Sequence, residues 1–239
     1  MENAVAAIIL ASGWSADGRG PGRPGPSENG PPDALRPVDG GVALSVVLRT
    51  LQAVPVSRIV AVLGRDAAAI RERVQLDGVT VVELSSPEPM IESVRAGLRA
   101  LPPEATAALI WPVDRALVAI RTARMLLAAH EAGARLAVPV CTVPGDDEGR
   151  RGHPVLFDRS LFAELAGAAG AEGAAAVVHA HEADLTPVEV EDRGILADVG
   201  SPEVQAMLAR LKAEANGFTG SDLGNGHGSS PPRRRRKGA

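Results

Sequence analysis

The sequence contains no tyrosine, and aromatic residues of all kinds account for only 2% of its 239 positions. Because large rings are so scarce, the core must be built mainly from alanine, valine, leucine and isoleucine. Hydrophobic residues make up 45% of the chain, which is ample for a full core. Length and composition therefore predict one domain, over residues 1–215, followed by a tail over 216–239.

Cysteine is equally scarce, since Cys141 is the only one. A single cysteine excludes an internal disulfide and cannot by itself form a structural zinc site. The sequence has no apolar run of transmembrane length, and its N-terminus lacks the basic segment and cleavage pattern of a signal peptide. These absences predict a cytoplasmic protein with no membrane partner.

Charge is distributed unevenly between the domain and the tail. The whole chain carries a formal charge of -4, but residues 216–239 carry +4, which leaves -8 for residues 1–215. Glycine, serine, asparagine and proline precede the basic cluster Arg233–Lys237, so we expect the tail to be disordered. Without interleaved aromatic residues, the cluster is interpreted as a nonspecific electrostatic tail for acidic partners or nucleic acid.

The first apolar run, Val5–Leu10, has no polar member and predicts a strand buried on both faces, as in a parallel sheet covered by helices. It is followed by Ala11-Ser12-Gly13, whose small side chains leave the backbone amides open to a large, anionic ligand. The alternative is an ordinary tight turn between a strand and a helix.

Strands and helices alternate regularly over the first 140 residues. Further strands are predicted over 58–64, 79–84, 107–111 and 136–140, and helices over 42–54, 66–74, 89–101 and 118–131. Such alternation with short links predicts an α/β fold with a mostly parallel sheet and helices on both faces. Proline and glycine interrupt residues 13–37, which predicts a long loop there.

The alternation is less regular after residue 140. We expect a charged turn over 145–151, a short strand over 152–157, a helix starting over 161–165, a strand pair over 186–190 and 195–199, and a final helix from Ser201-Pro202 to about 215. The cluster of His179, His181, Glu182 and Asp184 has irregular spacing, so a solvated surface turn is favoured over a metal site.

Several segments, in this order, are similar to those of MobA-like NTP transferases, especially the molybdenum-cofactor cytidylyltransferases. They are AIILASGWS, LRPVDGGVALSVVLRTL, RIVAVLG, PMIESVRAGLRALP, ALIWPVDRALV, RRGHPVLFDRSLFAEL and VEVEDRGILADVGSPEV, and they extend to about Leu211. The resemblance implies a three-layer α/β/α Rossmann-like fold of the GT-A type. It also implies Mg²⁺-dependent transfer of a nucleotidyl group from an NTP, CTP or GTP, to a phosphorylated small molecule such as molybdopterin, with release of pyrophosphate.

The resemblance places the nucleotide at the turn after the first strand and at the start of the helix near residue 90. The matching residues are Leu10, Ala11, Ser12, Gly13, Ser15 and Ser93, with Arg19 replacing the family's arginine in a shifted register. Ser93 could instead be a capping or packing serine. Asp33 stands where the family has a lysine, and its carboxylate would repel a triphosphate. Arg23 or Arg36 is the candidate substitute for that lysine.

Asp114 matches the family's catalytic, metal-binding aspartate at the end of the fourth strand. Its alternatives are a helix N-cap or a salt bridge with Arg115 or Arg121. Asp198 matches the first aspartate of the family's Asp-x-Asp-Thr-Pro segment and is a second candidate metal ligand. Gly200 replaces the other aspartate, and glycine has no side chain with which to bind a metal.

His153 lies in a Gly-His-Pro segment near the acceptor side of the family's cleft. It could hydrogen-bond or orient a phosphate, and the alternative is a histidine that holds a turn together. Two functions therefore stay open. One is an active nucleotidyltransferase; the other is a catalytically impaired relative that binds nucleotide or serves as an accessory protein in molybdoenzyme maturation. The departures from the family pattern at Asp17, Asp33 and Gly200 favour the second function over the first.

Overall fold

The computed structural model describes residues 4–13, 31–85, 89–143, 146–169 and 172–218. Its central strand is β1 (Val5–Ala11), whose residues are all buried. β4 (Arg58–Leu63) and β6 (Ala107–Pro112) run parallel to β1 on either side. The uninterrupted apolar run at the start of the chain thus occupies the position that its composition predicted.

Within the described residues, β1 belongs to a sheet of eight strands with the order β10-β7-β9-β6-β1-β4-β5, and β8 pairs with β7 outside this order. The remaining strands are β5 (Val79–Glu83), β7 (Leu136–Val143), β8 (Asp146–Arg151), β9 (Val155–Asp158) and β10 (Leu185–Glu189). Only β8 and β9 run antiparallel to their neighbours, so the predicted, mostly parallel sheet is confirmed.

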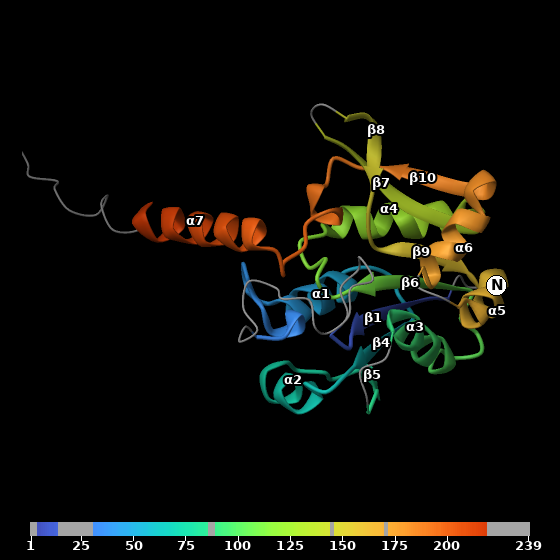
Figure 1. Ribbon diagram of the computed structural model, residues 1–239, viewed down its shortest axis with the longest axis horizontal. Helices are drawn as coiled ribbons and strands as arrows, with labels where there is room; N and C mark the ends of the chain where they lie inside the picture. The colour runs from blue at the N-terminus through green and yellow to red at the C-terminus, as the bar shows by residue number, and fades with distance from the viewer. Residues whose placement is uncertain (1–3, 14–30, 86–88, 144–145, 170–171, 219–239) are drawn as a thin grey trace, which may run out of the picture.

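Helices cover both faces of this sheet, which confirms the three-layer α/β/α architecture (Figure 1). The helices on one face are α1 (Ala43–Gln52), α2 (Ala67–Arg73) and α4 (Ile120–Glu131), and those on the other are α3 (Met90–Arg99), α5 (Phe162–Gly167) and α6 (Ala174–Ala180). Alternate residues of β1 divide between the two cores, as expected for a pleated strand.

The smaller elements connect this framework. They are β2 (Pro37–Val38), β3 (Gly41–Val42), and the 3₁₀ turns η1 (Asp33–Leu35), η2 (Arg159–Leu161), η3 (Glu182–Asp184) and η4 (Arg193–Ile195). The last helix, α7 (Pro202–Phe218), extends away from the sheet (Figure 1). Among the described residues no helix combines the length and apolarity needed to cross a membrane.

Two expectations for the second half of the chain are wrong. Residues 146–151 form strand β8 rather than a charged turn, because β7 continues to Val143 and offers an antiparallel partner. Residues 195–199 are not a strand, because the Asp192 carboxylate accepts a hydrogen bond from the Gly194 amide and starts η4 instead. β10 pairs with β7 in parallel, without a hairpin partner of its own among the described residues.

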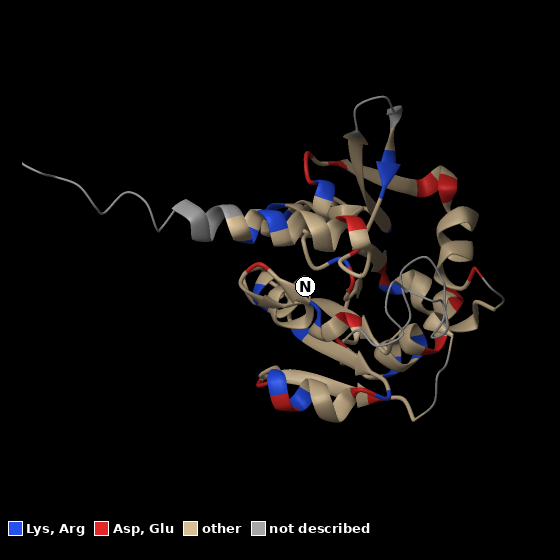
Figure 2. Cartoon of the chain, turned by 60° about the vertical axis from the view of Figure 1, so that its left-hand side comes forward, with Lys and Arg blue, Asp and Glu red and all other residues tan. Residues whose placement is uncertain are grey.

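Charged residues occur mainly in the helices and loops, and the central strands carry few of them (Figure 2). The exceptions that matter for function gather where β1 and β6 end. There the chain leaves the sheet at its carboxyl edge, which is the edge where open α/β sheets bind ligands.

Candidate functional site

Two glycines shape the turn after β1. Gly13 has a φ of 96°, a left-handed conformation that favours glycine, and no described atom lies within 4 Å of the position that a Cβ would take. Gly64, at the end of β4, lets the Ser12 carbonyl approach closely, since a Cβ there would lie 2.4 Å from that oxygen. The backbone of Ala11-Ser12-Gly13 is therefore held in place, and none of the described residues covers it on the side of Gly13.

Ser93 supports this turn from helix α3. Its hydroxyl lies 2.7 Å from the Ser12 hydroxyl, and the residue is fully buried. The N-cap of α3 is Pro89, so the alternative that Ser93 caps the helix is wrong. Of the other predicted nucleotide contacts, Leu10 is buried at the end of β1, while Ser15 and Arg19 lie outside the described residues.

Asp114 follows β6 directly beside this turn. Pro112 is paired with Leu10, and the Val113 amide donates to the Leu10 carbonyl at 3.0 Å. Asp114 is only 1% exposed, and its Oδ2 lies 3.4 Å from Nη1 of Arg115, so the salt bridge considered from the sequence is present. The N-cap alternative is wrong, because Ala119 precedes α4 and its amide donates to Asp192.

The turn after η4 brings Asp198 to the same place. The Val199 amide donates to the Asp114 carbonyl at 2.9 Å, which joins the two segments through the backbone. Oδ2 of Asp198 lies 3.8 Å from the same Arg115 nitrogen that approaches Asp114. The structure therefore collects both predicted metal ligands around one guanidinium group.

The two residues that depart from the family pattern, Asp33 and Gly200, also lie against each other. A Cβ on Gly200 would stand 3.1 Å from Oδ1 of Asp33 and 2.9 Å from Oδ1 of Asp198. Oδ1 of Asp33 accepts a hydrogen bond from Nε of Arg36 at 2.6 Å. A carboxylate from residue 33 thus stands near the space that a side chain at position 200 would use, and Arg36 neutralises it.

The donor set of this cluster suits a cation that shares its ligands with a substrate. Asp114 and Asp198 converge on a positive charge, and Mg²⁺ commonly takes one or two carboxylates together with waters and substrate phosphates. Within the part of the chain that the structure describes, no group of three or more His, Cys, Asp or Glu could hold a metal. The residues fit such a shared ion and not a cage made by the protein alone.

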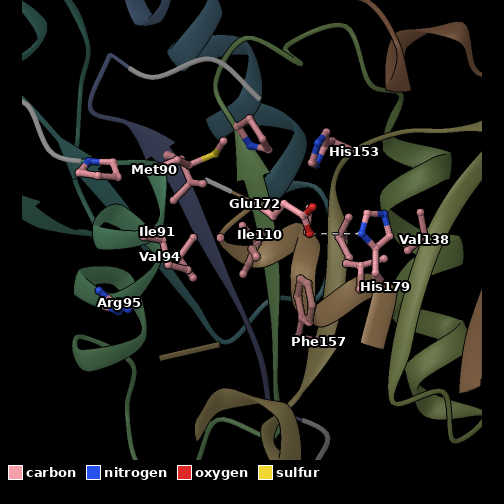
Figure 3. Close-up of a pocket in the computed structure, with 18 of the residues that line it drawn as sticks. Met90, Ile91, Val94, Arg95, Ile110, Val138, His153, Phe157, Glu172 and His179 are labelled. Carbon is pink, nitrogen blue, oxygen red and sulfur yellow. Dashed lines mark ion pairs between the residues drawn. The ribbon is translucent and has the colours of Figure 1, made fainter. Parts of the chain in front are cut away.

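A large cavity of about 1030 Å³ opens beside the cluster, between α3, α6 and strands β6, β7 and β9. Its wall is mainly aliphatic and aromatic, as Figure 3 shows for Ile91, Val94, Ile110, Val138 and Phe157. The charged side chains at its rim already have partners, with ion pairs joining Arg95 to Glu92, Arg151 to Glu182 and His179 to Glu172. The cavity therefore suits the uncharged part of a ligand.

His153 lines the cavity (Figure 3), and the charge of Arg115 in the neighbouring cluster acts on it. Its amide donates to the Ile195 carbonyl at 3.1 Å, and in the described part of the chain its buried Nδ1 has no hydrogen-bond partner. Burial, and secondarily the charge of Arg115, lower the pKa of His153 to about 4. The imidazole is therefore neutral at pH 7 and holds one unsatisfied ring nitrogen at the cavity wall.

The histidines of the cluster over residues 179–184 have a structural explanation. His179 belongs to α6 and pairs with Glu172, whereas Nε2 of His181 lies 2.7 Å from Oε2 of Glu164. Sequence reasoning missed both α6 and the cavity that it borders. Apolar residues that line a cavity have the same pattern as residues that fill a core, and nothing in the sequence distinguishes them.

The comparisons with known proteins agree with this geometry. The sequence profile of the family described as "MobA-like NTP transferase domain" matches residues 7–185. The crystal structure of Rv0371c from Mycobacterium tuberculosis H37Rv is similar at 25% identity with a TM-score of 0.70, covering 87% of this chain and 100% of that one. A search of curated protein sequences finds no significant match.

Two further structures extend the comparison. The Rv0371c structure described as a complex with manganese is similar at 25% identity and a TM-score of 0.61, covering 78% of this chain and 88% of that one. A 2-C-methyl-D-erythritol 4-phosphate cytidylyltransferase from Thermus thermophilus is 19% identical with a TM-score of 0.60, over 89% of this chain and 100% of that one. The latter similarity concerns the fold.

Proposed function

Since the chain belongs to the MobA-like NTP transferase domain family, we propose that it transfers a nucleotidyl group from CTP or GTP to a phosphorylated small molecule. Molybdopterin is the acceptor that the sequence resemblance favours, and pyrophosphate is the second product. The observation that carries the proposal is the open turn at Gly13 beside the buried carboxylate of Asp114, at the carboxyl edge of the sheet.

Each half of the site has a role in this reaction. The amides of Ala11-Ser12-Gly13 hold phosphate oxygens, and the Ser93 hydroxyl fixes the position of Ser12. Asp114 and Asp198 are the residues that would hold Mg²⁺, which neutralises the negative charge of the phosphates when it is bound. The manganese complex of Rv0371c supports the use of a divalent cation.

The acceptor's uncharged part lies in the cavity under this proposal. Neutral His153 can form a hydrogen bond with it through Nδ1, because each nitrogen of a neutral imidazole donates or accepts according to the tautomer. NTPs are cytoplasmic substrates, so we place the reaction in the cytoplasm. The basic segment 233–237 lies outside the described residues, and its contact with acidic partners or nucleic acid stays a prediction.

Two observations favour the second function, a relative that binds nucleotide without transferring it. Arg115 stands between the carboxylates that would hold the metal, and Asp33 replaces the family's lysine. A protein of this kind would serve as an accessory factor in molybdoenzyme maturation, presenting a bound nucleotide to a partner.

Calorimetric titration with CTP, GTP and ATP, with and without Mg²⁺, separates these functions when combined with an assay for pyrophosphate release. We expect binding that strengthens with Mg²⁺ and is lost in Asp114→Ala, and release reduced by roughly a hundredfold in that variant. Asp77→Ala, at an exposed position after α2, is the matched control. Tight binding without pyrophosphate release supports the accessory function, and no binding of any NTP overturns both.

A further inference from the structure

Arg115 occupies an unusual position. Its guanidinium is largely buried beside two carboxylates, and the nitrogen nearest to them, Nη1, makes no hydrogen bond to a described residue. Nη1 lies 3.4 Å from Asp114 and 3.8 Å from Asp198, and the side chain is 11% exposed. This nitrogen is buried and makes no hydrogen bond to any described residue. A buried donor left without a hydrogen bond is costly, and in native proteins such a group calls for an explanation, of which a catalytic role or a bound ion or water is one.

The other arginines around the site are already committed. Arg36 donates to Asp33, Arg95 to Glu92 and to backbone carbonyls of the α5 end, and Arg151 to Glu182. Arg115 differs from them, because its buried Nη1 has ion pairs with Asp114 and Asp198 but no hydrogen bond to any residue that the structure describes. Its main chain is anchored as well, because Nε1 of Trp111 donates to the Arg115 carbonyl at 3.1 Å.

The surroundings place this charge between the two parts of the site. The Asp114-Arg115 pair follows β6 directly alongside the turn that follows β1, since the Val113 amide bonds to Leu10. On the other side, the charge of Arg115 is felt by His153 at the cavity wall. An anion that extends from the turn at Gly13 to the mouth of the cavity would therefore pass the segment that carries Arg115.

We propose that Arg115 is the phosphate-binding cation of this site. It neutralises the negative charge of the phosphates, which Asp33 cannot do in place of the family's lysine. In the free protein, Asp114 and Asp198 hold the guanidinium in place. When a polyphosphate enters, Nη1 donates to one of its oxygens, forming a charge-assisted hydrogen bond. No covalent bond is made or broken. The inference rests on the proposed function only for the identity of the anion as the polyphosphate of an NTP.

The test uses inorganic tripolyphosphate as the probe, titrated calorimetrically into the full-length protein in EDTA at low salt. We expect the wild type to bind it, Arg115→Gln to bind it roughly tenfold more weakly or worse, and Arg115→Lys to retain most of the affinity. Arg121→Gln removes an exposed arginine from α4 and is the matched control with unchanged affinity. Added Mg²⁺ should increase the affinity for tripolyphosphate by a larger factor in Arg115→Gln than in the wild type.

Because Arg115→Gln leaves two carboxylates facing each other, a second variant guards against misfolding. Arg115→Gln/Asp198→Asn removes one charge of each sign and should still lose metal-free binding while keeping the melting temperature near that of Asp198→Asn. The inference is overturned if Arg115→Gln or Arg115→Gln/Asp198→Asn binds tripolyphosphate as tightly as the wild type does. It is also overturned if the wild type does not bind tripolyphosphate. Arg115-dependent binding in a protein that releases no pyrophosphate leaves the inference standing and overturns the transferase function.

Discussion

The two halves of the candidate site satisfy their polar groups in opposite ways. In the charged half, Asp33, Asp114 and Asp198 are paired with Arg36 and Arg115, and these ion pairs act together with the hydrogen bond from the Val199 amide to the Asp114 carbonyl. In the cavity half the wall is mainly apolar, and the charged side chains at its rim pair with each other or with a neighbour. The difference supports the division of labour proposed above, in which one half binds phosphates and the other the uncharged body of a ligand.

The halves also differ in how they are assembled. Segments far apart in the chain, at residues 33–36, 114–115 and 198–200, meet in the charged half. The cavity half instead lies between complete elements, helices α3 and α6 over strands β6, β7 and β9. Substitutions in the first half should therefore act through charge, and substitutions in the second through volume. His153, at the boundary, should respond to both.

The largest expected effect concerns the pH dependence at this boundary. The folded state keeps His153 neutral down to about pH 4, whereas the unfolded chain takes up the proton near pH 6.5. The contribution of His153 to the free energy of unfolding is therefore constant above pH 6.5. The free energy of unfolding falls as the pH decreases from 6.5 towards 4, by about 2 kcal/mol at pH 5. Urea unfolding at pH 7 and pH 5 should show a smaller loss in His153→Asn.

The matched control for this measurement is His179→Asn, since that side chain is largely exposed. It should keep the wild-type loss of stability between the two pH values. An identical loss in wild type and His153→Asn would show that His153 is not buried as a neutral group and would weaken the distinction between the two halves.

The next effect tests the cavity by filling it. Ala174 lines the cavity at the start of α6, and Ala174→Phe should reduce the affinity for the amphipathic fluorescent probe 1-anilinonaphthalene-8-sulfonate, whose rings bind apolar surfaces, by roughly tenfold. Tripolyphosphate binding should not change, because the charged half is untouched. Ala180→Phe, at the exposed end of the same helix, serves as the control. Loss of both probes in Ala174→Phe would mean that the halves are not independent.

The smallest effect concerns the charged half alone. Gly200→Asp would add a carboxylate against Asp33 and Asp198, and we expect it to lower the free energy of unfolding by about 1 kcal/mol. Adding Asp33→Lys to this variant should recover the loss, since the new charges are opposite. A urea-unfolding cycle of the wild type, both single variants and the double variant measures this coupling. Strict additivity would contradict the contact between the two positions.

Much of the framework followed from the sequence because its signals are local. The apolar run of β1, the period of α1, α3 and α4, and the strand ends at Gly64 and Asp114 each predicted an element within a few residues of its observed bounds. Resemblance to the family then identified Ser12, Asp114 and Asp198 as candidates. The segment from 145 to 200 was predicted less well, because β8 depends on pairing with β7 and η4 on an Asp192 side-chain contact.

What the sequence by itself determined is the order of elements and the set of candidate side chains, because hydrophobic periodicity and turn residues act over short distances along the chain. Only the tertiary structure decided that Arg115 stands between Asp114 and Asp198, that Asp33 lies against Gly200, and that an apolar cavity opens beside them. These relations join residues up to about 170 positions apart, and charge and volume act through space, so folding alone brings them together.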